Sequence, residues 1–411
     1  MKNRRPELLI PASSLEVLKT AVIFGADAVY IGGEAFGLRA KAKNFSMEDM
    51  REGIEFAHEH GVRVHVTVNI LAHNDDLEGV EGYLRELKEI GPDALIIADP
   101  AIFEMAKEIC PEIERHISTQ ANNTNYGTYR FWWKQGAKRV VSARELSLKE
   151  IKEIRERIPE EMEIESFIHG AMCISYSGRC LLSNYFTGRD ANQGACTHPC
   201  RWKYAVVEET RPGEYMPVYE NERGTYIFNS KDLCMIEHIP EMIDAGIDSF
   251  KIEGRMKTAL YVATVARTYR KAIDDYLEDP EKYKANMPWY LDQISNCTYR
   301  QFTTGFYFGK PSEESQIYDS NTYVKEYTYL GIIVGEKDGM YRIEQRNKFS
   351  VGETIEIMKP DGRNIEVTVR RIVDEDGNEQ ESAPHPKQVL YIDFGGEAEQ
   401  YDILRRAEPE T

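Results

Sequence analysis

The 411-residue chain is sparing in cysteine, with seven in all, and it has no apolar run of the about 20 residues that a membrane-spanning helix needs. Its start, MKNRRPELLIPASS, has no apolar stretch long enough for a secretory signal peptide before Pro11. We therefore expect a cytoplasmic protein without a membrane span. In that compartment clustered cysteines are more often metal ligands or catalytic groups than disulfides.

Positive charge is also scarce, since 51 Lys and Arg stand against 69 Asp and Glu, for a net charge of −18. That balance argues against broad electrostatic attraction to nucleic acid. A local basic groove remains compatible with it, because exposed charges are screened over roughly 8 Å. The Gly-rich dinucleotide fingerprint is missing between the first predicted strand and helix, which disfavours a Rossmann fold.

Short β-branched segments alternate with amphipathic helical segments up to about residue 275. For example, AVYIGG is followed by SMEDMREGIEFAHEHG, in which Ser46 is a suitable N-cap and Gly61 follows the helix end. About eight such repeats predict an α/β fold, a (β/α)8 TIM-like barrel with helices outside. TYIFNSKD and DSFKIEG are both expected to contribute barrel strands.

The residue composition and pattern change after the predicted barrel. Residues 276–324 are aromatic and irregular and are expected to be a linker. From 325 to 411 apolar and polar residues alternate around the turn signals KDG, PDG and EDG, which predicts a small antiparallel β-barrel domain. The expected domains are therefore a barrel at 1–275 with a Cys-rich insertion at about 171–225, a linker, and the C-terminal domain.

Polar residues follow several predicted strands, where the site of such a barrel is built. Gln120 and Asn122 follow ERHIST, and FKIEGR places Lys251, Glu253 and Arg255 on one face by the period of two. An arginine here can bind a carboxylate through two hydrogen bonds. We predict a small acidic substrate held by Lys251, Arg255, Gln120 and Asn122, although helix caps or an exposed charged edge would give the same pattern.

Four of the seven cysteines, Cys173, Cys180, Cys196 and Cys200, fall within 28 positions. Structural zinc sites show tight pairs, and only Cys196 and Cys200 are spaced that way. Irregularly spaced thiolates on a Gly-rich loop suit an iron–sulfur cluster, with zinc or disulfides as alternatives. A fifth candidate ligand is Cys234, at the end of the strand predicted at TYIF.

The segment ESFIHGAMCISYSGRCLLSNY resembles the signature of the collagenase-like peptidase U32 family. The resemblance extends through STQANNTN, NSKDLCMIEHIPEMIDAGIDSFKIEGRMK and FTTGFYFGKP, and thus over nearly the whole chain. It implies a [4Fe–4S] cluster held by Cys173, Cys180, Cys196 and Cys234, whereas the position of Cys200 is a ligand in only some members. Cys110 and Cys297 are then expected to be incidental.

Length, the C-terminal β domain and FTTGFYFGKP are similar to the branch of the family that makes 5-hydroxyuridine at the wobble position of tRNA. This resemblance implies tRNA as a partner and prephenate as donor or co-substrate, with a homologous partner subunit in some relatives. Glu165 and His169 of the signature, and Glu253, are the catalytic candidates.

A flipped base would need a stacking partner, for which Tyr176 or Tyr185 is suitable. The basic run of Arg39, Lys41 and Lys43 could contact phosphates, or could form a solvated loop. Three other functions stay open: a ribosomal RNA cytidine hydroxylase, a non-catalytic subunit of a hydroxylase pair, and a peptidase. The sequence shows neither GxSxG nor HExxH, which a peptidase of the familiar classes would carry.

Overall fold

The computed structural model describes residues 5–34, 36, 44–172, 176, 179–189, 191, 196–201, 205–206, 216–217, 229–296, 301–309, 316–317 and 327–408. The chain forms two compact units. The first comprises Met1–Lys19, Asp27–Lys257 and Arg300–Thr322, and the second Thr20–Ala26, Thr258–Tyr299 and Tyr323–Thr411. Among the described residues no helix combines the length and the apolar composition needed to cross a bilayer.

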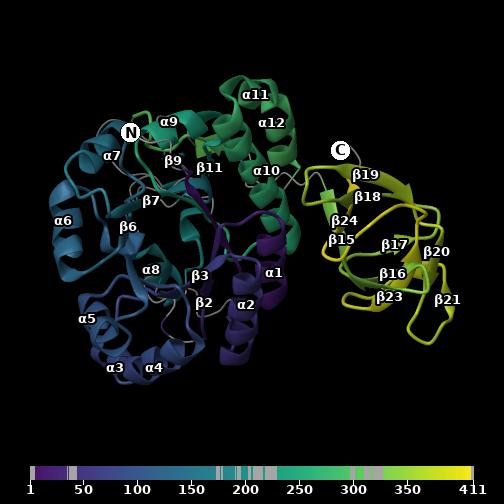
Figure 1. Ribbon diagram of the computed structural model, residues 1–411, viewed down its shortest axis with the longest axis horizontal. Helices are drawn as coiled ribbons and strands as arrows, with labels where there is room; N and C mark the ends of the chain where they lie inside the picture. The colour runs from purple at the N-terminus through teal and green to yellow at the C-terminus, as the bar shows by residue number, and fades with distance from the viewer. Residues whose placement is uncertain are drawn as a thin grey trace. The chain divides into compact units, whose positions relative to one another are not determined.

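Eight of the described strands in the first unit run parallel and close into a barrel (Figure 1), which confirms the predicted TIM-like fold. Around the barrel the order is β1-β2-β3-β4-β5-β6-β7-β12, and β12 pairs with both β1 and β7. The strands are β1 (Glu7–Pro11), β2 (Ala28–Gly32), β3 (Arg63–Val68), β4 (Ala94–Ile97), β5 (Glu114–Ile117), β6 (Arg139–Val141), β7 (Glu163–Gly170) and β12 (Ser249–Ile252).

Helices connect consecutive strands and lie outside the barrel (Figure 1). They are α1 (Leu15–Ile23), α2 (Met47–Glu59), α3 (Asn74–Leu77), α4 (Val80–Ile90), α5 (Pro100–Ile109), α6 (Tyr126–Gln135) and α7 (Leu148–Arg155). Their starts follow local capping chemistry. The Ser46 hydroxyl accepts a hydrogen bond from the backbone N–H of Asp49, and the Asp99 carboxylate accepts two at the start of α5.

Strand β3 shows how the sequence builds the barrel wall. Val64, Val66 and Val68 alternate with Arg63, His65 and Thr67, so one set faces the helices and the other the barrel interior. All three valines are fully buried, which places the main apolar core between strands and helices. The interior is in contrast partly polar, and this is where the chemistry of the barrel lies.

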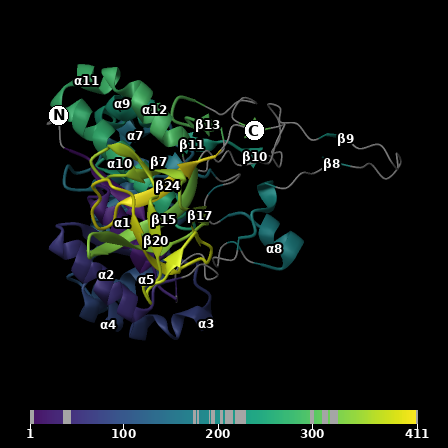
Figure 2. The same ribbon diagram turned by 90° about the vertical axis from the view of Figure 1, so that its right-hand side faces the viewer.

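The strand predicted at TYIF (225–228) lies outside the described residues. The described residues that follow it, from Asn229 on, form no barrel strand before β12, which closes the barrel by pairing with both β1 and β7. Instead β11 (Asp232–Cys234) pairs antiparallel with β7, and β13 (Phe302–Thr303) pairs parallel with β11 (Figure 2). The residues FT of FTTGFYFGKP, which we placed in a linker, therefore form a strand beside the barrel.

The Cys-rich segment is described in parts. It contains α8 (Leu182–Thr187), the 3-10 turn η3 (Pro199–Arg201), and the paired strands β8 (Ala205–Val206) and β9 (Met216–Pro217). After it come β10 (Asn229–Ser230), which pairs with β14 (Gln316–Ile317), and the 3-10 turn η4 (Ile236–His238) and α9 (Ile239–Asp244).

The second unit combines helices with an eight-stranded antiparallel sheet, which confirms the all-β character predicted beyond residue 325. Its helices are α10 (Ala259–Glu278), α11 (Pro280–Ala285) and α12 (Met287–Ser295). Its sheet comprises β15 (Tyr327–Lys337), β16 (Met340–Gln345), β18 (Thr354–Met358), β19 (Asn364–Thr368), β20 (Arg371–Val373), β21 (Glu379–Gln380), β23 (Val389–Asp393) and β24 (Ile403–Ala407), with β17 (Phe349–Ser350) and β22 (Ser382–Ala383) paired separately. Arg267 of α10 donates to the Lys359 carbonyl at 2.9 Å, so this helix packs with the sheet although we expected it in the barrel domain.

Candidate active site at the carboxyl end of the barrel

A buried ionic network occupies the barrel interior. Arg139 contacts the carboxylates of Glu7 at 2.5 Å, Glu163 at 2.6 Å and Glu165 at 3.1 Å. Burial raises the pKa of Glu7, but the Arg139 guanidinium outweighs it, so this pKa lies well below its ordinary value. Lys251 is also buried, and its ammonium lies 2.6 Å from Glu165. Glu165 and Lys251, predicted as catalytic and substrate-binding, are thus paired with each other inside the barrel.

Two arginines and one glutamate lie nearer the carboxyl end. The Arg144 guanidinium is 3.0 Å from the Glu253 carboxylate and 4.1 Å from the centre of the Phe167 ring. Arg255 donates to the Thr67 hydroxyl at 2.9 Å. Together these three charged groups carry one net positive charge, and guanidinium groups bind carboxylates well. This end of the barrel can therefore receive an anion.

Gly32 at the end of β2 allows Arg255 its position. A Cβ atom built on Gly32 would lie 2.4 Å from Nη1 of Arg255 and 3.1 Å from the Thr67 hydroxyl. A side chain here would displace the guanidinium from Thr67. The absence of a side chain at this strand end is thus part of the site.

The two predicted amides follow β5. Gln120 lies in the 3-10 turn η1 (Thr119–Ala121), and its buried Oε1 has no hydrogen-bond partner within the described part of the chain. Asn122 adopts a left-handed conformation with φ 52°, and its side-chain oxygen accepts a hydrogen bond from Arg179 at 2.9 Å. Because Arg179 precedes Cys180, this bond holds the Cys-rich segment against the carboxyl end of the barrel.

His169, a predicted catalytic residue, is buried near the end of β7. Burial, with a smaller contribution from Lys257, lowers its pKa to about 3, so the imidazole is neutral at physiological pH. Its ring centre lies 5.7 Å from that of Phe302, on β13. In the antiparallel pairing of β7 with β11 the register partner of His169 is Cys234. The structure thus brings a predicted catalytic residue and a predicted ligand to the same place.

Three of the four predicted cluster ligands lie in the described residues. Cys180 precedes α8, and the Ser183 hydroxyl of that helix accepts the backbone N–H of Thr197 at 3.0 Å. This bond holds the residue after Cys196 against α8. The turn η3, which contains Cys200, adjoins both α8 and β10. Cys180 and Cys196 therefore lie on adjacent segments, and Cys234 lies on β11 beside β7, while Cys173 lies outside the described residues.

The remaining sequence candidates are placed as follows. Cys110 is buried at the end of α5 and its thiol donates to the Ala106 carbonyl, as suits a structural residue. Tyr176 and Tyr185 are exposed, the latter by 82%. Those that lie outside the described residues are Arg39, Lys41, Lys43 and Cys297.

Sequence reasoning missed Arg144 and two histidines in the barrel interior, His65 and His116. Arg144 follows β6 by three residues in VVSAREL, a strand-end position of the kind that revealed Gln120. The histidines sit inside strands, at positions that alternate with valine or isoleucine. The signal was therefore a polar residue at every second strand position rather than at the strand end.

Comparison with known proteins places the chain in a family. It matches "Peptidase family U32" over residues 13–317 and "Peptidase family U32 C-terminal domain" over residues 325–405. A Bacillus subtilis protein named "tRNA hydroxylation protein P1" is 44% identical over 94% of this chain and 92% of its own length. The Escherichia coli "tRNA hydroxylation protein P" is 38% identical over 98% of this chain and 97% of its own.

A further relative carries a different name. The Escherichia coli "23S rRNA 5-hydroxycytidine C2501 synthase" is 38% identical over 68% of this chain, but that match covers only 41% of its own length.

Proposed function

The chain belongs to peptidase family U32, and from that premise we propose that it is an enzyme that hydroxylates tRNA, converting wobble uridine to 5-hydroxyuridine. The main support is the length over which the sequence matches its relatives. Relatives named for tRNA hydroxylation align along 92% and 97% of their own length, so they share both units of this chain. The relative named for ribosomal RNA shares less than half of its length. We therefore favour tRNA over ribosomal RNA.

We further propose a [4Fe–4S] cluster bound by Cys173, Cys180, Cys196 and Cys234. Cysteine thiolates are the usual ligands of such clusters, and the place of Cys234 beside the end of β7 supports this ligand set. Cys173 follows Gly170, the last residue of β7, by three positions, and Cys234 pairs with β7 in register with His169. When bound, the cluster would supply a redox-active or Lewis-acidic centre at the carboxyl end of the barrel.

Prephenate is the proposed donor or co-substrate. It carries two carboxylates, and Arg144 and Arg255 present two guanidinium groups at this end of the barrel. Glu253 is better suited to orient Arg144 than to transfer a proton, since its carboxylate already accepts from that guanidinium. Lys251 lies deeper and neutralises Glu165. We therefore propose that Arg144 and Arg255 bind the carboxylates of prephenate.

The imidazole of His169 is neutral at physiological pH, because burial lowers its pKa to about 3. Such a weak base suits a hydrogen bond to a substrate better than proton transfer. The exposed Tyr185 offers a ring on which a base from the anticodon loop can stack.

Nucleoside mass spectrometry of a deletion strain tests this function. Deleting the gene should remove 5-hydroxyuridine and its derivatives from tRNA, and the restored gene should return them, whereas an Arg144→Met version should return less. Loss of 5-hydroxycytidine from ribosomal RNA, with tRNA unchanged, would instead assign the chain to ribosomal RNA. Restoration only with a co-purifying homologous chain would show that it works as one subunit of a pair.

A further inference from the structure

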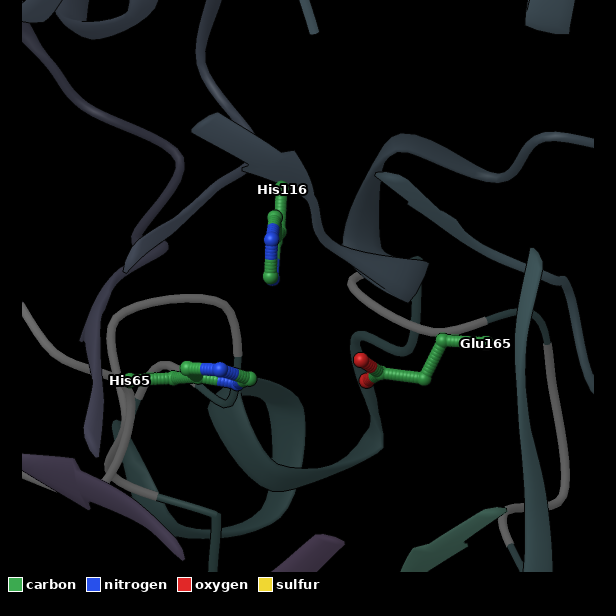
Figure 3. Close-up of side chains that lie close together, drawn as sticks. All are labelled: His65, His116 and Glu165. Carbon is green, nitrogen blue, oxygen red and sulfur yellow. The ribbon is translucent and has the colours of Figure 1, made fainter. Parts of the chain in front are cut away.

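Three side chains from alternate strands converge inside the barrel, apart from the cysteine ligands proposed above. His65 of β3, His116 of β5 and Glu165 of β7 are each fully buried. Figure 3 shows the Glu165 carboxylate directed toward the space between the two imidazole rings. One donor atom from each residue lies within 4.8 Å of the other two.

The two imidazoles leave buried polar atoms unsatisfied. Among the described residues, neither ring nitrogen of His65 has a hydrogen-bond partner, and neither has Nδ1 of His116. Nε2 of His116 lies 3.1 Å from the Glu114 carboxylate, which accepts hydrogen bonds, so Nε2 carries the proton. Nδ1 of His116 is then an unprotonated acceptor in the protein interior. Buried polar atoms of this kind nearly always have a hydrogen-bond partner. A missing partner is expected between these rings.

The hydrogen bond between His116 and Glu114 points to the nature of that partner. A metal-binding histidine usually donates its other ring N–H to a carboxylate, which orients the ring and makes it a better ligand. Two imidazoles and one carboxylate suit zinc and its first-row neighbours, whereas magnesium and calcium favour oxygen ligands alone. The donor set therefore selects a transition-metal dication.

The cations beside Glu165 are the main objection. Lys251 lies 2.6 Å and Arg139 3.1 Å from its two oxygens. The same network also contains the carboxylates of Glu7 and Glu163, which both contact Arg139. Two further cations join it, since Arg63 lies 3.7 Å from Glu7 and Lys138 3.7 Å from Glu163. Arg63 also pairs with Glu114, so four carboxylates face four cations and the network is close to neutral. Each Glu165 oxygen has two lone pairs, so it can contact a cation and still bind a metal ion.

We propose that His65, His116 and Glu165 form a buried binding site for one transition-metal dication of the zinc type, which ties β3, β5 and β7 together. Thr67 and Phe167 follow His65 and Glu165 by two residues and so lie one interior layer nearer the carboxyl end. The site is thus set below the groups assigned to the substrate, and its role is to stabilise the barrel. It does not depend on the proposed function.

Metal titration of the full chain tests the site. The protein is stripped with a chelator and titrated with Zn²⁺ against a chromophoric competitor, and with Co²⁺, whose absorption distinguishes imidazole–carboxylate from thiolate ligands. The stripped cysteines can bind metal as well, so we expect one equivalent beyond theirs, whose Co²⁺ spectrum has no thiolate charge-transfer band, and a Tm raised by Zn²⁺. His65→Asn and His116→Asn should abolish this binding, and the exposed His385→Asn is the matched control.

A second variant covers the case in which the histidine variants fail to fold. Glu114 is partly exposed and lies outside the ligand set, so Glu114→Gln should fold and bind Zn²⁺ about 10- to 100-fold more weakly. No stoichiometric binding by the wild type, a thiolate spectrum alone, or unchanged affinity in Glu114→Gln and His65→Asn would each overturn the proposal. An internal water between the rings would then be the partner.

Discussion

The ion pair between Arg144 and Glu253 is the sharpest test of how the carboxyl end of the barrel is organised. Replacing Arg144 by Met keeps much of the apolar stem but removes the charge 3.0 Å from the Glu253 carboxylate. The two side chains are 9% and 14% exposed, so water screens them little. Removal of the guanidinium leaves a nearly buried carboxylate without this partner.

The size of the effect follows from the geometry. Unit charges about 4 Å apart attract by about 4 kcal/mol at an effective dielectric constant of about 20. Coupling energies of contacting residues fall between about 0.5 and 3 kcal/mol, so we expect about 2 kcal/mol for this nearly buried pair. Loss of the contact with the Phe167 ring adds about 1 kcal/mol. Arg144→Met should therefore destabilise the barrel by about 3 kcal/mol.

A double-mutant cycle isolates the pair. The free energy of unfolding in urea is measured for the wild type, Arg144→Met, Glu253→Gln and the double variant. The exposed Arg130 gives a matched control, since Arg130→Met should show no coupling to Glu253→Gln. A coupling energy for Arg144 and Glu253 below about 0.5 kcal/mol would refute the view that Glu253 holds Arg144 in place.

Three further perturbations have defined outcomes. Gly170→Ala should lower the free energy of unfolding by at least about 2 kcal/mol, because φ is +105° and the new Cβ would lie 2.3 Å from the Glu253 carbonyl oxygen; an unchanged Tm would contradict this. Asp275 accepts four hydrogen bonds that hold its pKa below the ordinary value despite burial, so its contribution is present above about pH 4 and is lost as the pH falls further. Asp275→Asn should thus lower the free energy of unfolding at pH 7, and the gap between variant and wild type should shrink in urea titrations at pH 3. A gap of the same size at both pH values would contradict a lowered pKa of Asp275. In variants purified without oxygen, Cys234→Ala should lose most of its iron and Cys200→Ala should keep it, and the reverse result would exchange the two ligands.

The barrel could be predicted because its walls follow a simple rule. Strands that bury one face against helices alternate with helices that end at Gly. Eight repeats of this pattern are compatible with few folds other than a (β/α)8 barrel. The C-terminal sheet could be predicted for a similar reason, because apolar and polar residues alternate with a period of two around short turns. Both signals are local in sequence, and each repeats several times.

The position of β11 could not be predicted, because TYIFNSKD has the same local pattern as a barrel strand. The closure of the barrel decides which segment becomes a barrel strand. Because β12 pairs with both β1 and β7, no further strand fits between them. Cys234 was nevertheless expected close to the end of β7, and it is there by an antiparallel pairing that the sequence does not encode locally.

The polar interior was missed for another reason. His65 and His116 lie inside strands β3 and β5, whereas most of the predicted polar site residues follow strand ends. In an ordinary barrel these interior positions are filled by apolar side chains. Arg144 was overlooked because a single charged residue after a strand has many structural explanations, and only its contacts with Glu253 and Phe167 set it apart.

The central claim is that this chain hydroxylates tRNA, and a reconstituted reaction tests it most directly. The chain is purified without oxygen with its iron retained, and is incubated with prephenate and tRNA from a strain that lacks the gene. Digested tRNA is then analysed by mass spectrometry. The account predicts 5-hydroxyuridine at the wobble position, lost when prephenate is omitted or Cys234 is replaced by Ala. Unmodified uridine after incubation with iron-loaded protein and prephenate would contradict it.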